Sequence, residues 1–290
     1  MAAEIQTSRL AGSWYPADPD ELRVQVEDFL GDVSRGEPEV RAILVPHAGY
    51  RYSGRAAGAA YARVGRGRWK RALILAPSHY HAFAGAAVFP GDGFETPLGV
   101  CRVDLPASRR LAASPPFAHS AEPFRREHSL EIQLPFLQVI EPSIELVPVL
   151  LGVADDAPTL AALASGLRSI DDGQTLFVVS SDFTHYGVDF GYLPFAPRGA
   201  EYVAAELHRL DFGAIDPIRH GEVDRFTDYV RATGITVCGR GPIAAFLDLS
   251  AGRLAGELVA YYTSLDVTGD YEHSVSYAAL VFRPAGGTQA

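Results

Sequence analysis

The sequence contains little cysteine, a single lysine and no long hydrophobic run. Its 290 residues include two cysteines, Cys101 and Cys238, too few for a framework of disulfides. Lys70 is the only lysine, so nearly all of the positive charge is carried by arginine. With 25 basic residues against 35 acidic ones, the net charge of −10 argues against binding of nucleic acid through a basic surface.

The sequence also offers no pattern that would place it in a membrane. No apolar stretch is long enough to cross a bilayer, and residues 1–10 lack the basic start and apolar run of a secretory signal. We therefore expect a cytoplasmic protein without a membrane partner. Because no repeat, linker or shift in composition marks a boundary, we expect residues 1–290 to form a single domain.

Three short apolar runs each lead into a histidine. The runs and the polar residues after them are 41–45 with His47, 71–76 with His79, and 175–179 with Asp182 and His185. Short runs rich in Val, Ile and Leu between turn residues are typical of strands buried on both faces. Because ligands of open α/β sheets bind beyond the carboxyl ends of the strands, these polar side chains should share one site that is able to hold a metal.

Strand and helix patterns alternate along the rest of the chain. This order predicts an α/β fold in which helices flank a mainly parallel central sheet. Asp18 is expected to cap a first helix, Ser53 to cap a second one, and Pro135 to kink a helix over 126–137. Further helices are expected at 156–170, 199–210, 221–232 and 242–250, further strands at 144–151, 257–265 and 274–282, and a hairpin at 94–104.

His47 and His79 occupy equivalent places after two predicted strands. A single loop histidine is most often just hydrogen-bonded, but two neutral imidazoles at adjacent strand ends suit Fe, Zn or Cu. Pro77 ends the second strand, so we expect His81 to lie behind the ligands or at the surface. Exposed or structural roles are expected for the other isolated histidines, which are His119, His208, His220 and His273.

Cys238 stands before Gly239-Arg240-Gly241-Pro242, where a helix is expected to begin. A thiol at a helix N-terminus beside an arginine is expected to have a lowered pKa, and a thiolate is a soft metal ligand. The alternative is a buried and inert cysteine, which is the role that we expect for Cys101.

Three more residues are candidates for proton transfer. His128 follows Glu127 at a predicted helix start and is either an active-site acid or base or a buried residue of that helix. Asp182 and His185 are close enough in sequence for the carboxylate to fix the tautomer of the imidazole. Asp182 could equally cap a helix, and both roles are compatible.

Six short segments spread over most of the chain resemble the Memo family, whose bacterial members carry the label AmmeMemoRadiSam system protein B. The segments are Ser13-Trp14-Tyr15-Pro16, Pro46-His47-Ala48-Gly49-Tyr50, Pro77-Ser78-His79, Glu127-His128-Ser129-Leu130-Glu131, Ser180-Ser181-Asp182-Phe183-Thr184-His185 and Cys238-Gly239-Arg240. No single segment would be specific, but together they are.

The resemblance implies a fold like that of the class III extradiol, non-haem iron dioxygenases. It also implies a metal held by two histidines and a cysteine, which match His47, His79 and Cys238 here. Residues that match the pocket around that metal are His128, Asp182 and His185. Gly241 departs from the pattern, because a histidine is expected there in animal members.

These residues lead to a first functional hypothesis. His47, His79 and Cys238 would hold Fe(II), or else Cu or Zn, on one face and leave positions for O2 and a small-molecule substrate. His185, oriented by Asp182, would move protons, and His128 would hydrogen-bond from the other side. Trp14 and Tyr52 are the expected substrate contacts.

Two other hypotheses stay open at this point. A non-enzymatic protein could hold a metal or a peptide end in the same pocket, with the aromatic residues Trp14, Tyr15, Tyr50 and Tyr52 suited to docking a peptide. A hydrolase could use Cys238 as nucleophile with His185 and Asp182 as base and orienter, but it would leave His47 and His79 without a role.

Overall fold

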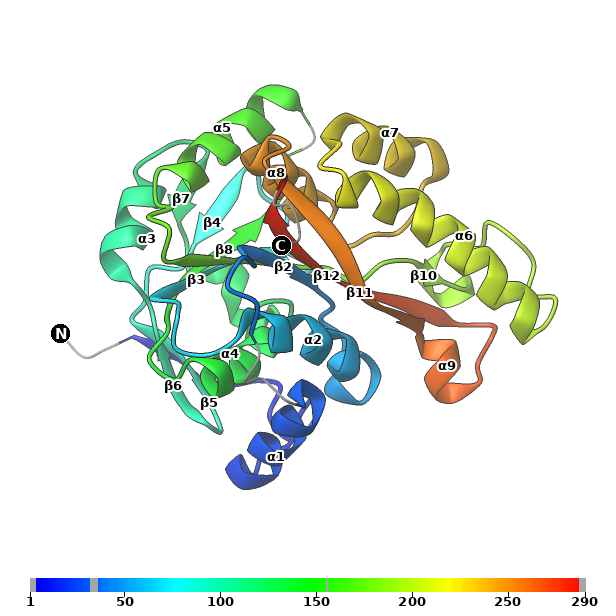
Figure 1. Cartoon of the computed structure of the whole chain (residues 1–290), viewed down its shortest axis with the longest axis horizontal. Helices are drawn as coiled ribbons and strands as arrows, with labels where there is room; N and C mark the ends of the chain where they lie inside the picture. The colour runs from blue at the N-terminus through cyan, green and yellow to red at the C-terminus, as the bar shows by residue number, and fades with distance from the viewer. Residues whose placement is uncertain (1–3, 32–35, 155, 287–290) are drawn as a thin grey trace.

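A central β-sheet organises the chain in the computed structural model, which describes residues 4–31, 36–154 and 156–286. Within these residues the sheet has nine strands in the order β10-β12-β2-β9-β3-β8-β4-β7, with β11 paired to β12 (Figure 1). The strands are β2 (Ala42–Val45), β3 (Arg71–Pro77), β4 (Ala86–Val88), β7 (Phe117–His119), β8 (Glu145–Leu151), β9 (Thr175–Ser180), β10 (His185–Tyr186), β11 (Leu254–Thr263) and β12 (Ser274–Pro284).

The middle of this sheet is parallel. β2 pairs with β9, β9 with β3, and β3 with β8, all in the same direction. The antiparallel strands β12 and β4 bound this parallel centre. The expected α/β sheet with a parallel centre is therefore confirmed, although the pairings of β10, β11 and β12 and the pairing of β4 with β8 are antiparallel. The carboxyl ends of β2, β3 and β9 lie at one edge.

A smaller three-stranded sheet, which contains the predicted 94–104 hairpin, lies beside the central sheet. Its strands are β1 (Ile5–Gln6), β5 (Gly93–Thr96) and β6 (Gly99–Arg102). β5 and β6 form the expected antiparallel hairpin, and β1 joins β5 in parallel. Cys101 lies buried in β6, as expected, and burial raises the pKa of its thiol to about 12.

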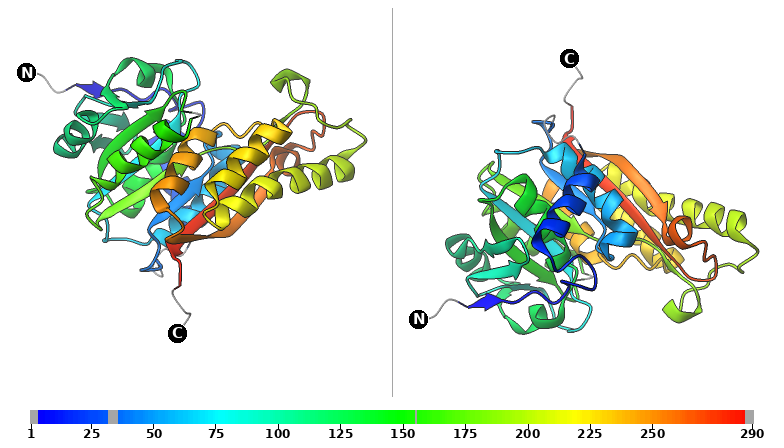
Figure 2. Two further views of the ribbon diagram at one scale, coloured as in Figure 1. Left: turned by 90° about the horizontal axis from the view of Figure 1, so that it is seen from above. Right: turned by 90° about the horizontal axis from the view of Figure 1, so that it is seen from below.

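Helices cover both faces of the central sheet. They are α1 (Pro19–Leu30), α2 (Tyr50–Val64), α3 (Leu105–Ala112), α4 (Leu134–Ile140), α5 (Ala157–Arg168), α6 (Ala200–Arg219), α7 (Val223–Thr233), α8 (Arg240–Ser250) and α9 (Ser264–Thr268). Figure 2 shows α5, α7 and α8 in front of the sheet from one side, and α1 and α2 from the other.

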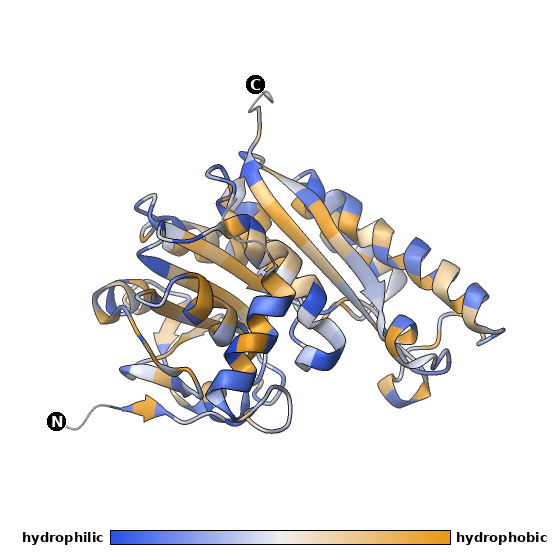
Figure 3. Cartoon of the chain, turned by 60° about the horizontal axis from the view of Figure 1, so that its bottom comes forward, coloured by the Kyte–Doolittle hydropathy of each residue, from blue (hydrophilic) through white to orange (hydrophobic). Residues whose placement is uncertain are grey.

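The strands are buried on both faces because alternate side chains enter two separate cores. In β2, Ile43 and Val45 join a core with α1, α2 and α4, whereas Ala42 and Leu44 join a core with α5 and α8. Figure 3 shows the resulting concentration of hydrophobic residues in the central strands. Both cores share one sheet, which confirms the single α/β domain.

The structure tests the two predictions about which residue caps the N-terminus of a helix. Asp18 caps α1 as expected, because its carboxylate accepts hydrogen bonds from the amides of Asp20 and Glu21. The prediction that Ser53 caps the second helix is wrong, because α2 already begins at Tyr50 after Gly49. The Ser53 hydroxyl instead donates to the carbonyl oxygen of Ala48 at 2.8 Å.

The predicted kinked helix over 126–137 is also wrong. The chain forms the 3₁₀ turns η2 (Glu122–Arg126) and η3 (Glu131–Gln133) before α4 begins at Leu134. Pro135 therefore stands in the first turn of a helix, where its missing N–H costs nothing, rather than inside one. Two other ends shift as well, since α6 continues past residue 210 and α8 begins before residue 242.

No helix among the described residues is long and apolar enough to cross a membrane. A cytoplasmic location stays a prediction.

The close approach of α1 to α2 predicts that Gly58→Ala destabilises the fold. A Cβ atom at Gly58 would lie 2.4 Å from the carbonyl oxygen of Phe29, so backbone would have to move. We expect the free energy of unfolding to fall by about 1–3 kcal/mol, the usual cost of overpacking, in urea titrations followed by circular dichroism.

Gly241→Ala is the matched control for this prediction. It also adds one methyl group to a helix, but the nearest atom to its Cβ would be 3.9 Å away. This variant should be neutral or gain up to about 1 kcal/mol from helix propensity. Equal stabilities of the two variants would contradict the packing argument.

Candidate metal centre

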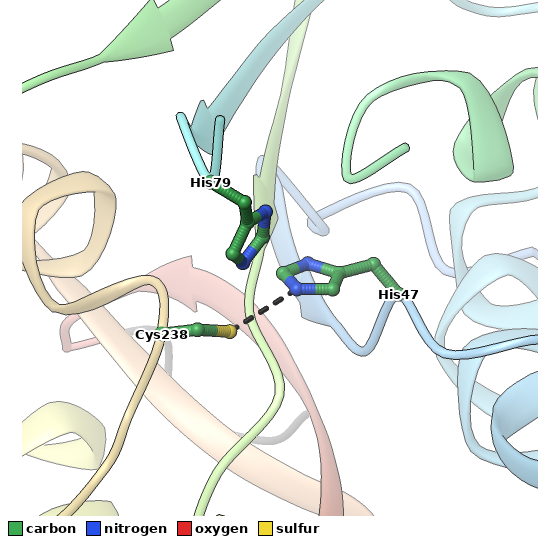
Figure 4. Close-up of side chains that lie close together, drawn as sticks. All are labelled: His47, His79 and Cys238. Atoms are coloured by element: carbon green, nitrogen blue, oxygen red, sulfur yellow. Dashed lines mark hydrogen bonds between the residues drawn. The ribbon is translucent and has the colours of Figure 1, made fainter. Parts of the chain in front are cut away.

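Three distant parts of the chain meet at the carboxyl edge of the sheet. His47 follows β2, His79 follows β3, and Cys238 comes from the loop between α7 and α8. One ligand atom from each of these side chains lies within 4.8 Å of the other two (Figure 4). The structure therefore brings together the two imidazoles and the sulfur that the sequence proposed as ligands, although their role as ligands stays a prediction.

Both ring nitrogens and the backbone amide of His47 have close polar partners. It is 1% exposed, its Nδ1 lies 2.9 Å from Oγ of Ser180, and its Nε2 lies 3.1 Å from Sγ of Cys238. Its backbone amide donates to the carboxylate of Asp182 at 2.7 Å. Burial, and then the neighbouring His79, lower the pKa of His47 well below its usual range, so the ring is neutral at neutral pH, as a metal ligand must be.

His79 is oriented by a buried carboxylate. Glu127 accepts a hydrogen bond from the His79 ring at Nδ1 (2.8 Å) and another from the His79 backbone amide (2.6 Å). It also accepts from the amides of His128 and Ser129. Burial alone would raise the pKa of Glu127, but the hydrogen bond and charge of His79, with these amides, outweigh it and lower the pKa to about 2.

Cys238 does not have the lowered thiol pKa that the sequence predicted. Burial, and then the negative charge of Asp182, raise the pKa of its thiol, although the Asp182 amide donates to Sγ at 3.2 Å. The predicted lowered pKa is therefore wrong, because desolvation outweighs the helix N-terminus and the nearby arginine. Coordination of a cation by the sulfur would supply the stabilisation that a thiolate needs here.

His128 stands against the two histidines but not at a helix start. It lies between the turns η2 and η3, and its ring stacks on His79 with centroids 4.6 Å apart. Trp14 covers it from outside, with ring centroids 4.7 Å apart. Burial and then His79 lower the pKa of His128 to about 4. Its Nδ1 is buried and makes no hydrogen bond with the residues that the structure describes.

Asp182 and His185 do not form the expected hydrogen-bonded pair. The His185 ring uses Nδ1 to contact the carbonyl oxygens of Phe183 (3.0 Å) and Thr236 (3.1 Å). Asp182 instead accepts from the amides of His47 and Ala48. It caps no helix either, because the chain after it enters β10. Asp182 shapes the His47 turn, and burial raises the pKa of its carboxyl, which the nearby His185 offsets only in part.

An open cavity of about 720 Å³ leads to this cluster. His79, His81, His185 and Cys238 line it, together with rim residues that include Tyr80, Val153 and Phe190. Trp14 and Tyr52 are not among its lining residues. Trp14 contacts the ring of His128, and Tyr52 packs against the core beside Tyr262, so their role as substrate contacts stays a prediction.

The four isolated histidines have exposed or structural surroundings, as expected. His119 is exposed in β7, and His208 is exposed and stacks on Phe212. The His220 ring contacts the carbonyl oxygen of Asp216. The His273 ring lies near the carboxylates of Asp189 and Asp270.

Sequence reasoning gave no role to three residues of this site. Glu127 is the carboxylate behind His79, Ser180 is the hydroxyl behind His47, and Gln133 donates to Ser180 from the end of η3. The signal for Glu127 was its place beside His128, and the signal for Ser180 was its place at the end of β9. For Gln133 the sequence held no signal.

The donor set fits a transition metal. Both histidines have Nδ1 engaged by a hydrogen-bond partner, which leaves each Nε2 as the nitrogen available to a cation. A second group, His79 with Glu127 and His128, also has ligand atoms within 4.8 Å of one another. We favour the first group, because Glu127 is already committed to His79 and three backbone amides.

Fold and site together define an α/β protein with a candidate centre of two histidines and one cysteine at the carboxyl edge of its sheet. Residues 6–281 match the family model described as Memo-like protein, and the chain belongs to the Memo family.

Known proteins agree with this assignment. A MEMO1 family protein of Thermococcus kodakarensis is 33% identical over 96% of this chain and 99% of its own length. Protein MEMO1 of Rattus norvegicus is 31% identical over 93% of this chain and 94% of its own length. A crystal structure of an uncharacterized protein from Escherichia coli K12 has a TM-score of 0.51 at 12% identity, covering 83% of this chain and 99% of that one, which shows a shared fold.

The hydrogen bonds of Glu127 predict a pH-dependent contribution to stability. Because its pKa falls from an unfolded value of about 4.3 to about 2, the stabilisation is complete above the unfolded value and is lost as pH falls through the folded one. In chelator-treated protein, the advantage of the parent over Glu127→Gln should shrink by about 1 kcal/mol between about pH 6 and about pH 3.5.

Urea titrations of both proteins across this range measure the effect. Glu27→Gln, on the exposed side of α1, controls for the loss of one negative charge. A difference between the parent and Glu127→Gln that does not change with pH would contradict the assignment.

Proposed function

We propose that the protein binds Fe(II) through His47, His79 and Cys238 and acts as a non-haem iron oxidoreductase on a small molecule. The observation that carries this proposal is the meeting of two imidazole nitrogens and one Sγ within 4.8 Å, beside a cavity large enough for a small substrate.

Three protein ligands of this kind suit several metals. Imidazole is a good ligand for Fe, Zn and Cu, and thiolate favours the softer of them. Iron is our first choice because three ligands from one side resemble the facial arrangement of non-haem iron oxygenases, with the sulfur in place of a carboxylate. Bound Fe(II) would supply one-electron and dioxygen chemistry at the positions that the protein leaves free. Copper and zinc are the alternatives.

His185 is suited to accept a proton from a substrate in the cavity. Its Nδ1 faces two carbonyl oxygens, which only accept, so Nδ1 carries the ring proton. The neutral ring therefore has a bare Nε2, and the residue lines the cavity. No carboxylate is needed to fix this tautomer, because the carbonyls of Phe183 and Thr236 do so.

We propose that His128 stays uncharged and acts on the centre through His79, on which its ring stacks, since it is not among the residues that line the cavity. Its lowered pKa keeps the ring neutral at neutral pH, and its buried Nδ1 is 3.4 Å from Glu127. Trp14 packs over the ring and limits the access of water on that side. The resemblance implies a fold like that of dioxygenases, but such a fold implies no activity by itself, since one fold hosts many functions.

A non-enzymatic peptide-binding protein is the second candidate, and the cavity rim favours it. Tyr80, Val153 and Phe190 are 49%, 61% and 43% exposed and lie around the opening. Exposed apolar side chains around a pocket are typical of a surface that receives a partner.

A cysteine hydrolase has less support. The hydrogen-bond partner of Cys238 on the imidazole side is His47 and not His185, and burial raises the pKa of the thiol. The nucleophile–base pair that this hypothesis requires is therefore not formed.

Loss of one proposed ligand should abolish tight metal binding. In protein purified without oxygen and loaded with Fe(II), we expect His47→Ala and Cys238→Ser each to weaken Fe(II) binding at least about 100-fold. Loss of a residue that only hydrogen-bonds to a metal ligand usually costs less, about 10- to 100-fold. Elemental analysis and competition with a chelator measure the change, and elemental analysis of the parent as purified, before any metal is added, decides between iron, copper and zinc.

His119→Ala and Cys101→Ser are the matched controls, since they remove an exposed histidine and a buried cysteine elsewhere. Both should bind metal like the parent. Unchanged binding in both His47→Ala and Cys238→Ser would refute the proposed centre.

Oxygen uptake separates the enzyme from the binding protein. With Fe(II) bound and candidate phenols present, the parent should consume O2, and His185→Gln should reduce kcat by roughly 10²-fold or more while keeping its iron, since general base catalysis is worth that much. His208→Gln, an exposed histidine in α6, should behave like the parent. Absence of iron-dependent uptake over a broad set of phenols would favour the second candidate.

A further inference from the structure

The hydroxyl of Ser180 is shared by three neighbours in the interior. Ser180 is fully buried, and its Oγ lies 2.6 Å from the carbonyl oxygen of Ser129, 3.0 Å from Nε2 of Gln133 and 2.9 Å from Nδ1 of His47. A hydroxyl has one hydrogen to donate and two lone pairs to accept with. The roles of these three contacts can therefore be worked out one by one.

The Ser129 contact uses the single hydrogen. A carbonyl oxygen cannot donate, so Ser180 must donate to Ser129. The contact with Gln133 fills one lone pair, provided that the amide nitrogen faces Ser180. It does, because the same nitrogen lies 3.0 Å from the carbonyl oxygen of Pro46, which requires a donor. The amide oxygen of Gln133 accepts from the hydroxyl of Tyr61 at 3.1 Å, which completes the orientation.

One lone pair of Ser180 then remains for His47. We infer that His47 must donate from Nδ1, and that Ser180 and Gln133 are positioning residues that hold its ring in the Nδ1–H tautomer. Its Nε2 consequently carries no proton and points a lone pair at Sγ of Cys238, 3.1 Å away. The inference rests on the proposed function only where it concerns metal binding.

His47 and His79 both donate a hydrogen bond from Nδ1, but the groups that accept it differ. His79 donates from Nδ1 to the buried carboxylate of Glu127, whereas His47 donates to a neutral hydroxyl. A carboxylate partner makes an imidazole a stronger donor to a metal than a neutral partner does. Ser180 thus sets the tautomer of His47 without placing a second negative charge behind the centre.

Nitrogen-15 NMR of metal-free protein with labelled histidine tests the tautomer directly, at about pH 7.5. The parent should show His47 with a protonated Nδ1 and an unprotonated Nε2, and Ser180→Ala should show both tautomers. Ser180→Thr, which keeps the hydroxyl, should restore the parent pattern. Ser129→Ala is the matched control, because its buried hydroxyl bonds to Pro77 and its carbonyl is unchanged.

Gln133→Met serves as an independent variant if Ser180→Ala does not fold. Without the amide donor, the Ser180 hydroxyl can turn toward Nδ1, so a second tautomer should appear. A parent protein with a protonated Nε2, or a single unchanged tautomer in both Ser180→Ala and Gln133→Met, would overturn the inference.

Iron binding by the same variants supplies a second readout. Ser180→Ala should bind Fe(II) roughly 10- to 100-fold more weakly than the parent and Ser129→Ala. If the parent shows the expected tautomer but binds no metal, the proposed function fails while the assignment of the tautomer stands. Equal affinity of Ser180→Ala and the parent would overturn the part of the inference that concerns the metal.

Discussion

The parallel pairing of β9 with β2 on one side and β3 on the other is the constraint on which the site depends. Val45 lies beside Ser180, and Leu75 beside Val179, so the three strands end at one level. His47 and His79 each follow within two residues of their strand, which leaves little freedom in where their rings lie. Burial of these strands in two cores fixes that register, because a shift by one residue would exchange the two faces.

The polar side chains buried at this edge of the sheet are stabilised by a network of hydrogen bonds. Asp182, Ser180 and Glu127 each accept or donate several hydrogen bonds, and most of these join segments far apart in the chain. A buried polar group without a partner would cost about 1–3 kcal/mol, so such a network holds its members in a single arrangement. The same network orients the ring nitrogens, and it therefore links the stability of the edge to the chemistry that the edge can perform.

Desolvation shifts the pKa values of two of the proposed ligands in opposite directions. It favours the neutral imidazole of His47, which is the form that binds a metal, but it also favours the neutral thiol of Cys238, which is not. A cation between them would reverse the second effect, so binding should release the thiol proton. Membership of the Memo family and the α/β fold are established by the comparisons and the architecture, whereas the metal and the reaction are proposals that rest on this arrangement.

The sequence was enough to predict most of the helices, the long strands of the central sheet and the polar residues after β2, β3 and β9, because side-chain periodicity and turn residues act over a few neighbours. It misplaced the start of α2 and the helix around Pro135, where turns compete locally with helix. The pKa of Cys238 and the hydrogen-bond partners of the two imidazoles depend on how distant parts of the chain pack together. Burial and hydrogen bonds join residues such as His47 and Ser180, which are 133 positions apart, and no local pattern encodes them.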